Sequence, residues 1–518
     1  MKKPLILFNI LFIAVLTLGI FFRFYNLDKK VYWFDETITS LRSAGYTETE
    51  LIQQTYDGNE IGSDKLKDYL KTNSTRGFFD VIKSLAREDS QHPPLYFVIL
   101  QLWMKLFGSS TSVIRSLSAI FSFLTLPLIY WLCVELFESH LTAKLATLLI
   151  AISPFHILYA QEAREYSLWI ATTLLSSVTF LRAIRINTRF TWCIYAISAI
   201  ASLYAFLFSG FILISHLTYL LIKQSFKLNK IIIYSLLSYT SAIIVFMPWL
   251  IIVLINYKKV NKTTDWSTQR LPILLSANGN DSLVYRWMLN ISRLFIDIDN
   301  KSGNFLTFIL IGLTTALTIY SLYFLYKKSS PRIWIFILTL IAILAFSLMI
   351  PDVIFRWQRS AMSRYLFPSY LGIQIAVAYL LSKKIVSQQI WQKRLWSSVM
   401  VMLISSGIIS CILSSQSEGW WSKIQSYSIR PVARTINAVA RPLVISDTSV
   451  GNILPLAWIL DSDVKLKLLV KPKVPVVPEN FNDIFLYKAS GSMQEQLKSN
   501  YRIEKVKDLN NLKRLVKK

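Results

Sequence analysis

Long apolar runs separated by short polar connections constrain the fold of this chain more than any other feature of its sequence. The first run follows Lys2 and Lys3 and ends near Phe22, and no small-residue cleavage site follows it, so we interpret it as a retained helix. Ten further runs occupy 113–134, 141–158, 166–181, 191–206, 208–222, 231–256, 304–325, 332–350, 365–382 and 396–413. With 53% hydrophobic residues, the chain is predicted to be an all-α polytopic membrane protein.

Four connections between these runs carry cations and no acids, and they set the expected orientation. They are 182–189, 223–230, 327–332 and 383–394. Because loops rich in Lys and Arg stay on the cytoplasmic side, these connections are predicted to be cytoplasmic. The alternating segments at 257–303, at 351–364 and from 414 onward are then external.

The short run 94–107, which follows Pro93, decides the number of spans. Counting the spans forward from Lys2 and Lys3 and backward from 182–189 gives one orientation only if this run lies at the interface without crossing. We therefore expect eleven spans, with the N-terminus in the cytoplasm and the C-terminus outside, in a bacterial inner membrane. A single long helix through Ser209 would reverse the predicted orientation of every span upstream of it.

The external segments predict two domains. Residues 1–413 are expected to form the transmembrane domain, with long external loops at 23–93 and 257–303. Residues 414–518 are expected to form a small extracytoplasmic α/β domain. Its sequence contains the strand-like stretches PLVISD, VKLKLLV and DIFLYKA and the helical stretch SMQEQLKSN.

The net charge of +26 has two interpretations. A basic excess is common in nucleic-acid-binding proteins, but it also arises when cytoplasmic loops are loaded with cations. The cations here are distributed over loops on both predicted sides of the membrane, so we exclude nucleic acid as a partner. The cysteines, Cys133, Cys193 and Cys411, fall in apolar runs without metal-ligand spacing, and we interpret them as small apolar fillers.

Four polar clusters lie at predicted external ends of the apolar runs. They are WFDET (33–37), QHPPLYF (91–97), QEAREYSLW (161–169) and RSAMSRYLFP (359–368). An acidic pair such as Asp35 and Glu36 is, by itself, as well explained by solvated carboxylates near a membrane surface. The occurrence of four clusters on one predicted face favours a site instead.

In this order, the stretches WFDET, HPPLYFVILQLWMKLFG, AREYSLW and RYLFP resemble the signatures of polytopic glycosyltransferases with the GT-C fold. The resemblance is to the group of protein O-mannosyltransferases and lipid A aminoarabinose transferases, over roughly residues 1–385. It implies an enzyme that takes a monosaccharide from a polyprenyl-phosphate donor and transfers it, with inversion, to an acceptor at the external leaflet. The acceptor can be a lipid, a polysaccharide or a protein.

The resemblance also implies roles for the acidic pair. Asp35 corresponds to the first acid of the family's pair and is the candidate base for the acceptor hydroxyl. Glu36 would orient the acceptor or help to hold a divalent cation. Two carboxylates alone make a poor metal site, so a divalent cation is the one cofactor we consider.

Four residues are candidates for holding the donor phosphate: Arg364, Tyr365, Arg164 and His92. A structural alternative pairs Arg164 with Glu162 or Glu165, and places Arg364 at lipid headgroups. Some relatives carry a Glu-Lys pair before the proline, where this chain has Gln91 and His92, which weakens any inherited metal site. His92 then either donates to the phosphate or caps the following helix.

Two other function classes share this topology, a lipid-linked-sugar transporter or flippase and an oligosaccharide ligase. A transporter is expected to carry ionisable residues inside its spans, whereas Arg115, Glu135 and Lys144 all fall near span ends. A ligase shares the carrier chemistry, but the position of WFDET in the first external loop favours a monosaccharide transferase.

Overall fold

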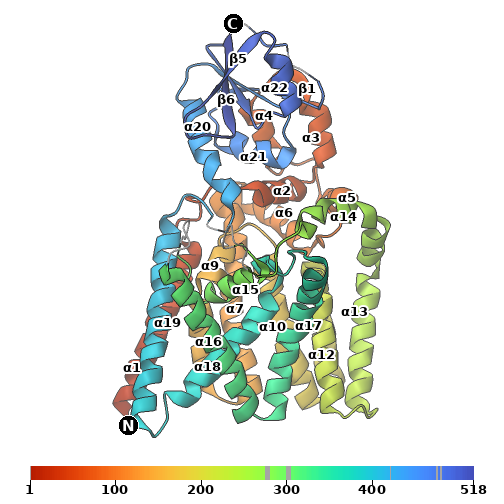
Figure 1. Cartoon of the computed structure of the whole chain (residues 1–518). Helices are drawn as coiled ribbons and strands as arrows, with labels where there is room; N and C mark the ends of the chain where they lie inside the picture. Colours follow the sequence, from red (N-terminus) through yellow and green to blue (C-terminus); the bar gives the residue numbers. More distant parts are fainter. Residues whose placement is uncertain (1, 275–280, 299–304, 421, 474–475, 479–480) are drawn as a thin grey trace. The chain divides into compact units, whose positions relative to one another are not determined.

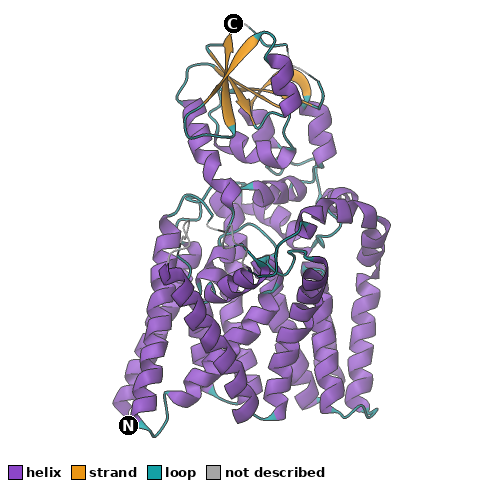
Figure 2. Cartoon of the chain, viewed as in Figure 1, coloured by secondary structure: helices purple, strands orange, loops and turns teal. Residues whose placement is uncertain are grey.

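The computed structural model of the chain describes residues 2–274, 281–298, 305–420, 422–473, 476–478 and 481–518. It divides into two compact units, each of which is described by itself. Unit 1 comprises Met1–Tyr25, Ser90–Tyr96 and Arg115–Gln416. Unit 2 comprises Asn26–Asp89, Phe97–Ile114 and Ser417–Lys518. Figure 2 shows the helices of unit 1 in purple and the strands of unit 2 in orange.

Unit 1 is built from helices that coincide with the predicted apolar runs (Figure 1). The long helices are α1 (Lys2–Phe24), α7 (Thr111–Phe137), α8 (His140–Ala151), α10 (Tyr166–Ile186), α11 (Arg189–Ala205), α12 (Ser209–Lys223), α13 (Lys230–Ile255), α16 (Phe305–Lys328), α17 (Pro331–Phe355), α18 (Phe367–Lys384) and α19 (Ile390–Gln416). Shorter helices are α9 (Pro154–Ala160), α14 (Tyr257–Thr264) and α15 (Leu283–Ser292). The polytopic all-α prediction is confirmed.

Within the part of the chain that the structure describes, seven helices are long and apolar enough to cross a membrane: α1, α7, α10, α13, α16, α17 and α19. The α8–α9 pair, bent by 59°, makes an eighth if it is one broken span. The helices α11, α12 and α18 form at three more predicted spans but do not reach that length and composition, so the number eleven stays a prediction. The expected break near Ser209 is present, because α11 ends at Ala205 and α12 begins at Ser209.

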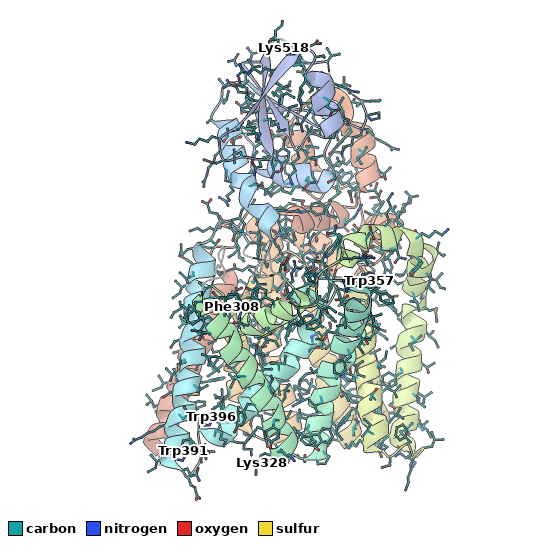
Figure 3. The ribbon with its side chains drawn as sticks, in the orientation of Figure 1. Phe308, Lys328, Trp357, Trp391, Trp396 and Lys518 are labelled. Carbon is teal, nitrogen blue, oxygen red and sulfur yellow. The ribbon has the colours of Figure 1, made fainter. Side chains whose placement is uncertain are left out.

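The cation-rich connections of unit 1 gather at one end. Figure 3 places Lys328, Trp391 and Trp396 at this end and Phe308 and Trp357 toward the other. Figure 1 shows the N-terminus at the same end, next to the connections α12–α13, α16–α17 and α18–α19. This arrangement is what the positive-inside prediction requires. The assignment of this end to the cytoplasm stays a prediction.

A buried arginine accounts for the break between α8 and α9. The Arg23 guanidinium, on α1, donates hydrogen bonds to the carbonyl oxygens of Ala151 (2.6 Å) and Ile150 (3.0 Å), where α8 ends. The two helices approach closely, since a Cβ added at Gly19 would lie 2.4 Å from the Ala151 oxygen. Because hydrocarbon offers no hydrogen bonds to a broken helix, Arg23 supplies the donors that the Ala151–Pro154 turn needs.

Unit 2 contains a six-stranded mixed sheet with the order β1-β3-β2-β4-β6-β5. The strands are β1 (Asp57–Gly62), β2 (Pro442–Ser446), β3 (Lys465–Leu469), β4 (Asp483–Tyr487), β5 (Tyr501–Lys505) and β6 (Leu512–Lys517). The pairs β2–β3 and β2–β4 are parallel, and the others are antiparallel. The helices are α2 (Phe34–Ser43), α3 (Glu48–Thr55), α4 (Ser63–Asp68), α5 (Phe78–Glu88), α6 (Leu95–Phe107), α20 (Ile429–Asn437), α21 (Val450–Ile459) and α22 (Gly491–Leu497).

The first external segment contributes to the same sheet as the C-terminal segment. The strands β2, β3 and β4 and the helix α22 form where the sequence predicted them, but the edge strand β1 comes from the predicted loop 23–93. Its register pairs Ile61 with Leu466 and Gly62 with Lys465. The stretch DGNEIG has no alternating apolar pattern, and its partner lies four hundred residues away, so local periodicity gave no signal for it.

Candidate functional site

The acidic pair lies in the first turn of α2. Trp33 has an extended backbone and precedes the helix, and its N–H donates to the Glu36 carboxylate at 3.3 Å. Glu36 is fully buried, whereas Asp35 is partly exposed. Carboxylates stabilise the N-terminal end of a helix, because they accept hydrogen bonds from N–H groups that have no partner within the helix and because they complement the helix dipole. Glu36 therefore has a structural role at the start of α2, and Asp35 is the more accessible acid.

The other end of α2 is fixed by an ion cluster. The buried Arg42 guanidinium contacts the carboxylates of Glu48 (2.8 Å), Glu88 (2.5 Å) and Asp89 (2.7 Å). Burial alone would lower the pKa of Arg42, but the three carboxylates outweigh it and raise the pKa well above its usual value. Arg42 thus ties α2 to the end of α5 and the start of α3, which holds the helix that carries Asp35 in a defined place within unit 2.

In unit 1, two of the predicted phosphate-binding residues meet on one carboxylate. His92 Nδ1 lies 2.9 Å from Glu165 Oε1, and Arg164 Nη2 lies 3.1 Å from the same oxygen. Arg164 Nη2 is also 3.3 Å from His92 Nε2. The Glu165 side chain is fully buried, while 20% of the His92 side-chain surface is exposed. The structure therefore places Arg164 against one of the two acids that sequence analysis offered as its partners.

The charge of Glu165 follows from these contacts. Burial raises the pKa of Glu165, but Arg164 and His92 outweigh it, and the pKa falls to about 2. The carboxylate is therefore ionised at neutral pH and contacts both the Arg164 guanidinium and the His92 ring. Sequence analysis named Glu165 only as a partner. The sequence signal for Glu165 as a site residue is the presence of two acids within QEAREYS, in an otherwise apolar stretch.

Arg364 and Tyr365 lie in the short turn Ser363–Tyr365 before α18. The Arg364 guanidinium stacks 5.3 Å from the centroid of the Trp266 ring, and the Tyr365 ring lies 5.4 Å from that of Phe208. Stacking on an aromatic face holds the plane of an arginine guanidinium in one orientation. The Trp266 ring therefore fixes the position of the Arg364 guanidinium within unit 1.

Tyr159, on α9, connects the two clusters of unit 1. Its hydroxyl is 3.1 Å from Ser363 Oγ, and it interacts electrostatically with Glu162 and Arg364. Phe367, which continues RYLFP, packs its ring 4.9 Å from that of Tyr159. The packing of aromatic rings thus brings the segments QEAREYS and RYLFP together, although two hundred residues separate them in sequence.

The structure groups the predicted site residues by unit. His92, Arg164, Arg364 and Tyr365 belong to unit 1, and Asp35 and Glu36 belong to unit 2. A meeting of the acids with the cations around one substrate stays a prediction. Among the described residues, no group of three or more His, Cys, Asp or Glu side chains is arranged to hold a metal ion. Asp35 and Glu36 provide too few oxygen ligands for a divalent cation without water or substrate.

Comparisons with known proteins give a partial family match and a match in fold. Residues 91–252 match the family described as dolichyl-phosphate-mannose-protein mannosyltransferase, which is less than half of the chain. A search of curated protein sequences gives no significant match.

The fold is similar to that of solved structures of ArnT. The crystal structure of ArnT from Cupriavidus metallidurans bound to undecaprenyl phosphate matches with a TM-score of 0.55 and 11% identity, covering 98% of this chain and 97% of that chain. Its apo state gives a TM-score of 0.54 at 11% identity, covering 99% and 98%. A weaker likeness, with a TM-score of 0.47 and 11% identity, is to the oligosaccharyltransferase AglB from Archaeoglobus fulgidus, over 83% and 66%. At such identities, the likeness to ArnT establishes the fold alone.

Proposed function

We propose that this chain, which has the GT-C fold of ArnT, transfers a monosaccharide from a polyprenyl-phosphate donor to an acceptor at the extracytoplasmic face of the membrane. The observation that carries the proposal is the likeness in fold over nearly the full length of both chains, to a transferase solved with undecaprenyl phosphate. The four ordered motifs and the family match over residues 91–252 support the same activity.

The cations of unit 1 suit the donor side of this reaction. When the sugar leaves a polyprenyl phosphate, negative charge grows on the phosphate oxygens and needs fixed cations or donors. Arg364, stacked on Trp266, and Arg164, held by Glu165, offer guanidinium edges for this purpose. His92 is the third candidate, because its partly exposed ring is oriented by the same carboxylate.

The acid of unit 2 suits the acceptor side. In an inverting transfer, the acceptor hydroxyl oxygen forms a bond to the anomeric carbon as the bond from that carbon to the phosphate oxygen breaks. The hydroxyl proton passes to a carboxylate, and the electron pair of the broken bond leaves on the phosphate. Asp35 is the proposed proton acceptor, since it is partly exposed on the first turn of a helix fixed by Arg42.

The test uses the purified full-length chain in lipid nanodiscs with a radiolabelled polyprenyl-phosphate sugar and membrane extract as acceptor source. The wild type is expected to release polyprenyl phosphate and to label an acceptor. Asp35→Asn should abolish transfer, and Arg364→Ala should raise the KM for donor by about tenfold or more. Asp68→Asn, at an exposed acid of unit 2, is the matched control and should be unchanged.

Two results would contradict the proposal. Full transfer by Asp35→Asn would remove the proposed base. Movement of intact donor across a vesicle membrane, without release of polyprenyl phosphate, would instead make the protein a transporter.

A further inference from the structure

Unit 2 carries large apolar side chains that are strongly exposed on α5 and α6. They are Phe78 (46% exposed), Phe79 (71%), Leu102 (54%), Leu106 (74%) and Phe107 (57%). The opposite face of α5 is buried through Val81, Ser84 and Leu85. An extracytoplasmic unit rarely leaves such a group uncovered unless it contacts a partner or a membrane. These five residues are called the aromatic patch below.

Hydrogen bonds hold the two halves of the aromatic patch together. Gln101 Nε2, on α6, donates to the carbonyl of Gly77 at 3.3 Å, immediately before α5. One helical turn later, Lys105 Nζ donates to the carbonyl of Arg76 at 2.8 Å. The start of α5 therefore lies against the middle of α6, and Phe78 and Phe79 share one surface with the exposed leucines of α6.

The chain itself limits how far this surface can lie from a bilayer. Phe107 precedes Thr111 by four residues, and Thr111 begins α7, one of the helices long and apolar enough to span a membrane. Four residues reach at most about 14 Å when fully extended. Phe107, at the end of the aromatic patch on α6, is thus tied to within that distance of the start of α7.

The charges around the aromatic patch are those of a lipid contact. Lys83 follows Phe79 at the fourth position along α5, so the two share one exposed stripe. The acids of this region are engaged within the protein: Asp80 accepts from the Gly77 N–H, and Glu88 and Asp89 pair with Arg42. Aromatic rings rimmed by lysine and arginine are typical of surfaces at the boundary between headgroups and acyl chains.

We propose that the aromatic patch seats unit 2 in the headgroup–acyl boundary of an anionic lipid leaflet, with Lys83 and Lys105 at the phosphates. The proposal does not depend on the transfer reaction. It has a geometric consequence, because Arg42 ties α2 to the end of α5. Seating α5 on the lipid surface fixes the height of α2, and therefore of Asp35, above the bilayer.

The experiment measures lipid contact at single positions of the full chain in nanodiscs. A bimane label is placed at position 79, 106 or 68 of a Cys193→Ser background, since Cys133 and Cys411 are buried. Phospholipids with a nitroxide at a shallow acyl position should quench the label at 79 and at 106 at least about twofold more than at 68, which lies on the exposed helix α4. Equal quenching at all three positions overturns the proposal.

A second experiment distinguishes lipid from other partners of the aromatic patch. In the wild type, quenching at position 106 should rise when phosphatidylglycerol replaces phosphatidylcholine, and Lys83→Glu should remove that rise. Lys498→Glu, at an exposed lysine just after α22, is the control and should keep it. Two results would overturn the lipid assignment. One is that quenching does not rise in the wild type, and the other is that the labels are shielded from both water and nitroxide, as they would be beneath a protein partner. Elution as a single species in size exclusion confirms that each variant is folded.

Discussion

Among single residues, Glu165 has the largest influence on the predicted phosphate site of unit 1. One buried carboxylate oxygen contacts both His92 and Arg164, so Glu165 fixes the orientation of both predicted phosphate-binding side chains. Removing only its charge leaves the side chain's size unchanged but takes one carboxylate charge away from the buried Arg164 guanidinium. Such a change disrupts a buried pair more than it disrupts packing.

Glu165→Gln is therefore expected to raise the KM for the donor by about tenfold, with a smaller change in kcat, because the proposed donor binding depends on the two side chains that Glu165 orients. Steady-state kinetics with varied donor measure this, and Glu165→Asp should recover part of the loss. The matched control is Glu135→Gln, which removes a carboxylate paired with Arg185 at the other end of unit 1. An unchanged KM in Glu165→Gln would show that the ion pair does not position the donor site.

The same residue predicts a pH dependence of stability. The pKa of Glu165 is lowered from 4.5 to about 2, so its ion pairs contribute stability above pH 4.5 and lose it as the pH falls toward 2. The difference in unfolding temperature between wild type and Glu165→Gln should shrink as the pH falls below about 4.5. A difference that grows as the pH falls would contradict this sign.

At the scale of elements, the break between α8 and α9 is the feature that positions the site. The bend of 59° ends one apolar helix and starts another, so that α9 carries Tyr159 toward Ser363. A break at this depth exposes carbonyl groups, which hydrocarbon cannot satisfy. Arg23 supplies donors to two of them from the last turn of α1, and the absence of a side chain at Gly19 allows the close approach.

Arg23→Met is expected to lower the stability of unit 1 by about 2–4 kcal/mol, because methionine fills similar space but leaves the carbonyls of the break without donors. Thermal unfolding in detergent, followed by the loss of monomeric protein, measures the effect. Arg189→Met, at an exposed helix start, is the control and should change little. Equal unfolding temperatures for Arg23→Met and the wild type would mean that the break is held by other contacts.

At the scale of the whole molecule, unit 2 is assembled from three separate segments of the chain. Its larger core cluster combines Ile38, Leu41, Leu51 and Tyr56 from the first segment with Val444, Leu456 and Leu466 from the last. The Tyr56 hydroxyl donates to the carbonyl of Thr448 at 2.9 Å across the same boundary. The C-terminal segment packs one face of the sheet with its own residues, whereas the other face shares its core with residues 26–89.

A fragment of residues 417–518 expressed alone is expected to remain largely unfolded, because it lacks β1 and the apolar residues that α2 and α3 add to the core. Two-dimensional NMR should show poor amide dispersion, and co-expression with residues 26–114 should improve it. A well-dispersed spectrum from the fragment alone would instead establish an autonomous C-terminal domain.

Much of unit 1 could be predicted from the sequence, because its signals are local. Run length placed the helices, and loop charge grouped the connections that the structure gathers at one end. The motifs named His92, Arg164, Arg364 and Tyr365, all of which unit 1 contains. In unit 2, the strands β2, β3 and β4 have enough apolar alternation to be recognised, whereas β1 and the short helices around it do not.

Hydrophobicity and positive charge along the chain by themselves determined that this protein is a multi-helix membrane protein, where most of its helices begin and end, and which cation-rich connections gather at one end of unit 1. The tertiary structure alone decided the partners: Arg23 at the α8 break, Glu165 between His92 and Arg164, and β1 on β3. The physical reason is the separation along the sequence over which each interaction acts. Burial and insertion depend on local composition, whereas a pairing between distant segments depends on the shapes and charges that packing brings together.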